Sequence, residues 1–183
     1  MAKVCVFFAD GFEDIEGLTV VDVLRRGKVD VKTVSVTGSK NILTSHGVPL
    51  VTDELFENIG FEDVDAVVLP GGLKGTNALM AHEGVKKVIK DFAATGKYVC
   101  AICAAPSVLG MNGLLEGKKA TCYPGFEEKL LGAECDKAAK VVKDGNIITS
   151  RGMGTSIDFA LAILAVLTSE EKSTEIARQI QFI

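Results

Sequence analysis

The sequence has few of the features that mark secreted, membrane-spanning or nucleic-acid-binding proteins. Its five cysteines are an odd number spread from Cys5 to Cys135, unlike the paired cysteines of a small secreted domain. No stretch approaches the ~20 apolar residues of a membrane span, and the apolar run 4–9 is too short and wrongly flanked for a signal peptide. We therefore expect free thiols, no membrane partner and a cytoplasmic location.

Positive charge and histidine are also scarce. The 20 Lys and Arg residues are scattered and are outnumbered by 24 Asp and Glu residues, so the sequence predicts no basic face for nucleic acid. The two histidines lie in no metal-binding motif, because His46 sits in a predicted turn and His82 sits beside Glu83 at a predicted helix start. We expect neither a nucleic-acid partner nor a bound metal.

What the sequence does contain indicates one α/β domain over residues 1–183, since 48% of the chain is hydrophobic and single domains usually have roughly 100–200 residues. Apolar runs predict strands, and a strand pair with a turn at His46-Gly47 is expected within 40–52; the runs are 4–8, 31–36, 64–69, 98–102, 121–123 and 147–150. Helical spacing covers 15–26, 83–95, 104–109, 154–167 and 170–181. This alternation predicts an open, mainly parallel sheet with helices on both faces.

Three predicted strands end near residues suited to chemistry. The first leads to Glu16, the third leads to Gly71-Gly72, and the fourth leads directly to Cys103. Ligands of open α/β sheets bind beyond the carboxyl ends of the strands. We therefore expect these three segments to meet at one site.

Cys103 follows a buried strand and precedes a predicted helix, as the nucleophile does in a nucleophile elbow. The sharp turn needs small neighbours, which Ala101, Ala104 and Ala105 supply, and Pro106 suits the start of a helix. A thiol at a helix N-terminus has its thiolate form favoured. The alternative is that Cys103 is simply a small buried apolar residue.

Gly71 and Gly72 come directly after an apolar strand and leave backbone N–H groups open. With the N–H of Ala104, they could hold the oxyanion that forms when Cys103 attacks a carbonyl. The alternative is an ordinary glycine turn. A phosphate-binding loop is disfavoured, because residues 71–76 lack the spacing and the final Gly-Lys-Ser/Thr of that motif.

Glu16 is the last acidic residue of the segment 9–16. Glu13 and Asp14 are explained by the preference of carboxylates for a helix N-terminus. Glu16 lies further into the helical pattern, is followed by Gly17, and could point towards Cys103. A buried carboxyl group there would have a raised pKa and could share a proton with the thiol.

Two other patterns imitate functional motifs. Cys100 and Cys103 have C-x-x-C spacing, but an extended strand separates them by about 10 Å, which is too far for a disulfide. Residues 151–155 resemble the start of a dinucleotide fingerprint, but Ile157 occupies the place of its third glycine. We interpret this segment as a turn that allows close packing near the site.

Taken together, four segments resemble the DJ-1/ThiJ/PfpI family across nearly the whole chain. The segments are 9–16, 68–72, 101–106 and 149–155, in the family's order. The resemblance implies a flavodoxin-like sandwich, usually a homodimer, with the cysteine on the elbow and the glutamate hydrogen-bonded to it. Protease-like members have His directly after the cysteine, where this chain has Ala104, so a peptidase is not expected.

The Ala104-Ala105-Pro106 sequence after the cysteine resembles one branch of the family, and the chain departs from that branch at one position. That branch often has a His near the cysteine, at the position that Tyr123 occupies here. A tyrosine hydroxyl can donate a hydrogen bond but is a poor base at neutral pH. His46 could approach the pocket instead, from the same chain or across a dimer interface, and Arg151 and Arg26 could give positive potential near the cleft or that interface.

Two functions fit these residues. The first is a cofactor-independent enzyme of the glyoxalase or deglycase type, in which Cys103 attacks a small 2-oxoaldehyde, Glu16 moves protons, and the N–H groups of Gly72 and Ala104 hold the oxygen. The second is a sensor of oxidative stress or a protective protein without turnover, in which Cys103 is oxidised to a sulfinate. The sequence leaves both open.

Overall fold

The computed structural model describes residues 1–183 as eleven strands, six α-helices and three short 3-10 helices. The strands are β1 Lys3–Phe8, β2 Asp30–Ser35, β3 Asn41–Leu43, β4 Pro49–Val51, β5 Glu54–Leu55, β6 Ala66–Leu69, β7 Tyr98–Ile102, β8 Lys119–Ala120, β9 Glu134–Cys135, β10 Val141–Asp144 and β11 Ile147–Ser150. The helices are α1 Asp14–Arg26, α2 Leu73–Ala81, α3 Glu83–Thr95, α4 Pro106–Met111, α5 Ser156–Leu167 and α6 Glu170–Gln179, with η1 Phe56–Asn58, η2 Glu127–Lys129 and η3 Met153–Thr155.

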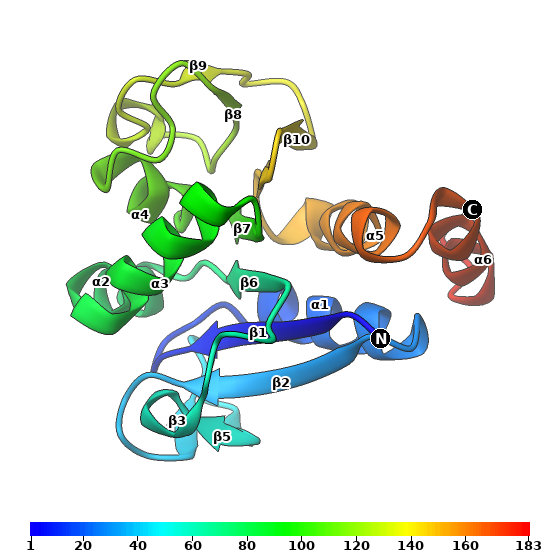
Figure 1. Ribbon diagram of the computed structural model, residues 1–183, viewed down its shortest axis with the longest axis horizontal. Coiled ribbons are helices and arrows are strands. Elements are labelled where there is room, and N and C mark those ends of the chain that lie inside the picture. Colours follow the sequence, from blue (N-terminus) through cyan, green and yellow to red (C-terminus); the bar gives the residue numbers. More distant parts are fainter.

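Seven strands form one sheet in the order β10-β11-β7-β6-β1-β2-β5, in which only the β10–β11 pair is antiparallel. Helices cover both faces (Figure 1). One face packs on α1 and α5 through residues such as Val20 and Phe159, and α6 packs against α5. The other face packs on α2, α3 and α4 through residues such as Leu79 and Val108. The flavodoxin-like α/β architecture is therefore confirmed, and none of the helices is both long and apolar enough to cross a membrane.

Several predicted elements have the predicted bounds or nearly so, including α3, β7, β11 and the β3–β4 pair. The Ser169 hydroxyl accepts the Lys172 N–H at 3.1 Å and caps α6, as its sequence indicates. The prediction of a strand at 121–123 is wrong, because the pairing stops at Ala120. The helix predicted from Ala104 begins at Pro106, after a turn.

The predicted convergence of three segments follows from the strand order. β1, β6 and β7 are adjacent and parallel, so their carboxyl ends lie at one edge of the sheet. The N–H of Glu13 donates to the carbonyl of Gly71 at 3.0 Å and joins the loop after β1 to the loop after β6. The sheet therefore brings the segments of Glu16, Gly71-Gly72 and Cys103 together.

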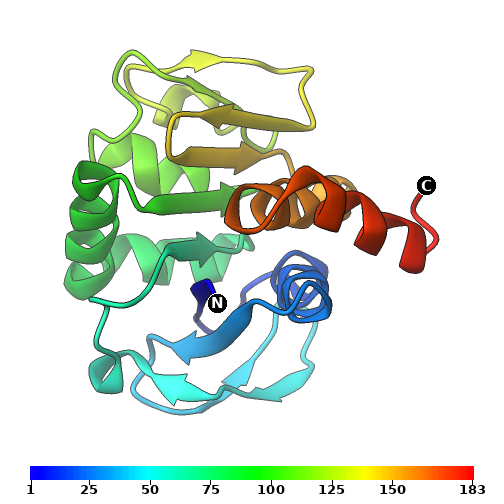
Figure 2. The same cartoon turned by 45° about the vertical axis from the view of Figure 1, so that its right-hand side comes forward.

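A smaller two-stranded parallel sheet, β8–β9, lies beyond the β10–β11 edge (Figure 2, green to yellow). The N–H of Thr121, directly after β8, donates to the Thr149 hydroxyl of β11 at 2.9 Å, and both groups are buried. The segment that follows β8 is thereby held against the main sheet, next to the end of β7.

Candidate active site at Cys103

Cys103 occupies a strained turn at the end of β7. Its φ of +66° lies in the left-handed region, which a residue with a side chain adopts only where the surrounding structure holds it. Its N–H donates to the carbonyl of Ser150 at 3.0 Å, and its carbonyl accepts the N–H of Tyr123 at 2.8 Å. These bonds hold the half-buried side chain above the sheet edge, as the elbow motif predicts.

Two backbone N–H groups point at the sulfur of Cys103. They belong to Gly72 and Ala104, and both act to lower the pKa of the thiol. Gly72 has a φ of +87°, a conformation that favours glycine. Gly71 is needed for a different reason, because a Cβ there would clash with Glu16 Oε2 and with the Cβ of Cys103. Of the three N–H groups expected to hold an oxyanion, those of Gly72 and Ala104 therefore lie at the sulfur, whereas that of Gly71 donates to Glu16 Oε2.

Glu16 lies in the first turns of α1 and is only 1% exposed. Its Oε2 accepts the N–H of Gly71 at 2.9 Å, whereas Oε1 has no hydrogen-bond partner of good geometry. Gly17 permits this burial, because a Cβ there would lie 2.5 Å from the ring of Phe8. A buried carboxyl oxygen without a full partner beside a thiol is a place where a proton can be held.

The two side chains change each other's ionisation. Burial raises the pKa of Glu16 to about 7, although the Cys103 thiol and the N–H groups of Gly71 and Met153 lower it. Burial also raises the pKa of Cys103 to about 12, and the charge and hydrogen bond of Glu16 add to the rise. The pair therefore retains one proton near neutral pH. The direction for Cys103 is opposite to the sequence-based expectation, because α4 starts three residues later and the sulfur is desolvated.

A cleft of about 530 Å³ opens over the pair. Glu13, Tyr123 and Arg151 line it with Glu16 and Cys103, and residues 152–155 complete the wall. Tyr123 is 50% exposed. Glu13 caps the N-terminus of α1 as expected, since its Oε2 accepts the N–H of Glu16 at 2.8 Å, and it also lines the cleft, which its sequence position does not indicate.

His46 does not line the cleft, so the expectation that it approaches the pocket is wrong within this chain. Its Nδ1 lies 2.8 Å from Asp14 Oδ2 at the start of α1, and its side chain is 71% exposed. Arg26 is also elsewhere, since its Nε donates to Asp22 at 2.8 Å. Of the other residues expected near the pocket, Tyr123 and Arg151 therefore line the cleft with Cys103, and Gly71 packs against Cys103.

The structure shows that neither the C-x-x-C spacing of Cys100 and Cys103 nor the segment 151–155 is the motif it resembles. Cys100 is fully buried inside β7, its thiol is free, and burial raises its pKa. The segment 151–155 turns through η3 and forms part of the cleft wall. A Cβ on Gly152 would approach Tyr123 to 3.2 Å and Glu16 Oε1 to 3.8 Å, so this glycine allows the close packing that the sequence predicted.

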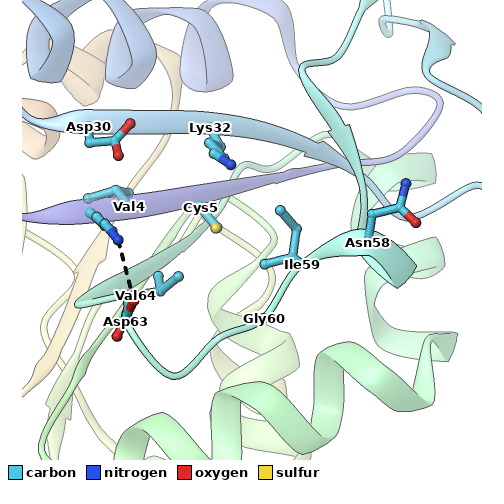
Figure 3. A pocket seen from close by; sticks show the side chains of 10 residues that line it. Val4, Cys5, Asp30, Lys32, Asn58, Ile59, Gly60, Asp63 and Val64 are labelled. Atoms are coloured by element: carbon cyan, nitrogen blue, oxygen red, sulfur yellow. Dashed lines mark ion pairs between the residues drawn. The ribbon is translucent and has the colours of Figure 1, made fainter.

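A second hollow, of about 180 Å³, contains another cysteine but no comparable partner (Figure 3). Cys5 lies at its base between Lys32 and Ile59, and Lys3 and Asp63 form an ion pair of 3.5 Å at its rim. Burial raises the pKa of Cys5 to about 11. Without a buried carboxyl group or N–H groups at its sulfur, this thiol lacks the surroundings of Cys103.

An open parallel sheet, a cysteine on a strained strand-to-helix turn and a buried glutamate facing it define a class of α/β proteins built around one elbow cysteine. The family within that class follows from comparison: the model of the DJ-1/PfpI family matches residues 2–166, and the chain belongs to this family.

Relatives in plants, animals and archaea are similar to this chain over most of its length. Protein DJ-1 homolog B of Arabidopsis thaliana is 40% identical over 96% of this chain, which spans only 40% of that protein. Drosophila melanogaster dj-1beta is 38% identical over 94% of this chain and 93% of its own length. A deglycase of Pyrococcus abyssi is 32% identical over 83% of this chain and 91% of its own length.

Solved structures agree in fold. The C103A mutant of a DJ-1 superfamily protein from Salmonella typhimurium has a TM-score of 0.94 at 36% identity, covering 99% of this chain and 98% of that chain. Oxidized DJ-1 of Toxoplasma gondii also has a TM-score of 0.94, at 33% identity, with the same coverage of both chains.

Proposed function

We propose that this protein is a cofactor-independent enzyme that converts small 2-oxoaldehydes to hydroxy acids, for example methylglyoxal to lactate. One observation carries the proposal: the sulfur of Cys103 faces the N–H groups of Gly72 and Ala104 and the buried carboxyl group of Glu16. The similarity to the Pyrococcus abyssi deglycase supports this class of chemistry, and repair of early glycation adducts would use the same residues.

In the first step the sulfur of Cys103 bonds to the aldehyde carbon while the carboxylate of Glu16 accepts the thiol proton. The carbonyl oxygen becomes an oxyanion and accepts hydrogen bonds from Gly72 and Ala104. Glu16 then returns the proton to this oxygen, which gives a neutral hemithioacetal.

In the second step Glu16 removes the hydrogen of the former aldehyde carbon as a proton, and the electron pair moves towards the ketone oxygen to give an enediolate. The hydroxyl proton of the hemithioacetal then passes to that oxygen, and Glu16 returns its proton to the former ketone carbon, which leaves a thioester on Cys103. The aldehyde carbon is thereby oxidised and the ketone carbon reduced, so no external oxidant is needed. Water then breaks the carbon–sulfur bond and releases the hydroxy acid. A carboxyl group with a pKa of about 7 suits both directions of proton transfer.

A second function uses the same surroundings. Stepwise reaction with two molecules of hydrogen peroxide would convert Cys103 to a sulfinate and release two water molecules. The N–H groups of Gly72 and Ala104 and a protonated Glu16 would donate hydrogen bonds to the new oxygens. The similarity to a Toxoplasma gondii DJ-1 structure in oxidized form favours this candidate.

The two functions are separated by product analysis. Purified protein is incubated with methylglyoxal without added cofactor, and NMR follows substrate and lactate. The enzyme proposal predicts one lactate for each methylglyoxal consumed, over many turnovers. No lactate, with Cys103 gaining two oxygen atoms under peroxide, would leave only the sensor.

We also propose that the protein is a homodimer in a reducing compartment such as the cytoplasm. Exposed apolar side chains occur on α1, at Ile15 and Leu18, and on the β3–β4 pair, at Leu43 and Val51. The N–H of Gly11 donates to the carbonyl of Leu43 at 2.7 Å and ties this pair to the loop before α1. Light scattering during size-exclusion chromatography tests the assembly, and a monomer mass would contradict it.

A further inference from the structure

Cys122 and Cys135 come from separate segments but occupy one face of the small sheet. Cys135 ends β9 and lies opposite Ala120 of β8, and the N–H of Asp136 donates to the carbonyl of Ala120 at 2.8 Å. Side chains alternate along extended backbone, so Cys122, two residues after Ala120, points to the same side as Cys135. The two side chains are therefore diagonal neighbours on one face, with Cβ atoms less than about 7–8 Å apart.

The surroundings of the two thiols bring them together. Both pack against the same core cluster, in which Cys122 is 4% exposed, and Cys135 lies at the cluster's edge with partial access to solvent. Burial raises the pKa of both thiols, but their mutual contact lowers the pKa of Cys135 and adds to the rise at Cys122. Cys135 is therefore both the more exposed thiol and the one whose thiolate this contact favours.

We propose that Cys122 and Cys135 form a second redox site, a dithiol that hydrogen peroxide converts to an intramolecular disulfide. The thiolate of Cys135 attacks one oxygen of hydrogen peroxide, the O–O bond breaks, and the other oxygen leaves as water after proton transfer. The resulting sulfenic acid is then attacked by the sulfur of Cys122, whose proton leaves with the hydroxyl group as a second water molecule. The two thiols lose two electrons, the peroxide gains them, and the products are one disulfide and two water molecules.

The remaining cysteines show why only this pair can react in this way. Cys5 and Cys100 are buried, and the groups that shift their pKa values include no other cysteine. The sulfur of Cys103 faces a carboxyl group and two N–H groups instead of a thiol. Oxidation therefore stops at a disulfide at one site and adds oxygen at the other.

The location links the new site to the cleft without making it depend on the proposed enzyme activity. Cys122 directly precedes Tyr123, whose N–H donates to the carbonyl of Cys103 at 2.8 Å. A disulfide at Cys122 would fix this part of the cleft wall.

The test is to treat the full chain with increasing hydrogen peroxide, block free thiols under denaturing conditions, and map peptides by mass spectrometry. We expect one linked pair of peptides containing Cys122 and Cys135, lighter by two hydrogen atoms and separated again by dithiothreitol. Non-reducing electrophoresis should show no covalent dimer. The link should also form in Cys103→Ser, which carries no reactive thiol at the elbow.

Variants complete the test. Cys135→Ser changes the more exposed partner and should abolish the link, with circular dichroism used to verify the fold. Cys5→Ser is the matched control, because it removes a thiol that has no thiol partner, and it should retain the link. Free Cys122 and Cys135 at peroxide levels that add two oxygens to Cys103 would overturn the proposal. A link between chains, or one that needs Cys103, would also overturn it.

Discussion

Cys103 and Cys122 each lie close to the end of a strand and each contact a second titratable side chain, but the partners differ. Cys103 faces the carboxyl group of Glu16, which holds a proton and cannot bond to sulfur. Cys122 faces the thiol of Cys135, which can bond to sulfur. The neighbouring side chain therefore decides the chemistry of each thiol: carbonyl addition and proton transfer at Cys103, and disulfide formation at Cys122.

The largest expected effect comes from replacing one sulfur atom by oxygen at each of the two sites and comparing the enzyme activities. Cys103→Ser should lower kcat/KM for methylglyoxal by at least about 10³-fold, since loss of a covalent nucleophile can cost up to ~10⁶-fold in kcat. Cys135→Ser should change it by less than about threefold, because the thiol of Cys135 lies outside the cleft lining. Steady-state rates on the two variants measure this, and similar losses in both would break the comparison.

The ionisation of Glu16 should be visible in stability. Its pKa is raised from 4.5 to about 7, so the folded protein holds a proton that the unfolded chain releases, and the free energy of unfolding falls as pH rises between these values. The fall corresponds to roughly 3 kcal/mol, since one pKa unit is 1.36 kcal/mol. Glu16→Gln removes this ionisation. In urea unfolding, the free energy of unfolding of the variant should therefore rise relative to that of the wild type between pH 4.5 and 8. A constant difference would contradict the raised pKa.

The close contact at Gly71 is required only by the Cys103 site. A methyl group there would clash with Glu16 and Cys103, so Gly71→Ala should cost about 1–3 kcal/mol of stability, as overpacking does. We expect turnover to fall at least about tenfold, while the Cys122–Cys135 link still forms. Gly154→Ala is the stability control, because a Cβ there meets nothing within 4 Å. If thermal unfolding gave the two variants equal stability, the loop after β6 would have moved to avoid the clash at residue 71, and the prediction would be wrong.

The smallest effect is expected at Tyr123. Its side chain is half exposed and its backbone N–H makes the bond to Cys103. Tyr123→Phe keeps that bond and should change kcat/KM by less than about threefold. A loss of about 10²-fold or more, the usual magnitude for a proton-transferring group, would instead assign such a role to the hydroxyl.

The sequence predicts most of the main sheet, because buried strands such as β7 are continuous apolar runs. It misses α2, whose stretch begins at Gly72-Leu73 and contains Gly75, so the pattern indicates a turn. It also misses β10, an edge strand that is only partly buried. Tertiary contacts stabilise both elements: α2 packs on the main sheet through Leu79, and β10 pairs with β11.

The sequence likewise predicts some features of the site and not others. Cys103, Gly72 and Glu16 follow from motif positions, and Gly17 is a physical signal for Glu16 because a small residue there lets the helix approach Phe8. The raised thiol pKa could not be predicted, because it depends on how deeply the folded chain buries the sulfur. The contact of Cys122 with Cys135 depends on the pairing of β8 with β9, which no local pattern indicates.

The most direct test is the pH profile of kcat/KM for methylglyoxal in the wild type and in Glu16→Gln. The carboxylate form of Glu16 must accept the thiol proton, so the wild-type value should rise through one ionisation near pH 7. Glu16→Gln should be slower by about 10²–10⁴-fold and should lack this ionisation. The same rise near pH 7 in Glu16→Gln would show that another group carries the proton and would contradict the pairing of Glu16 with Cys103.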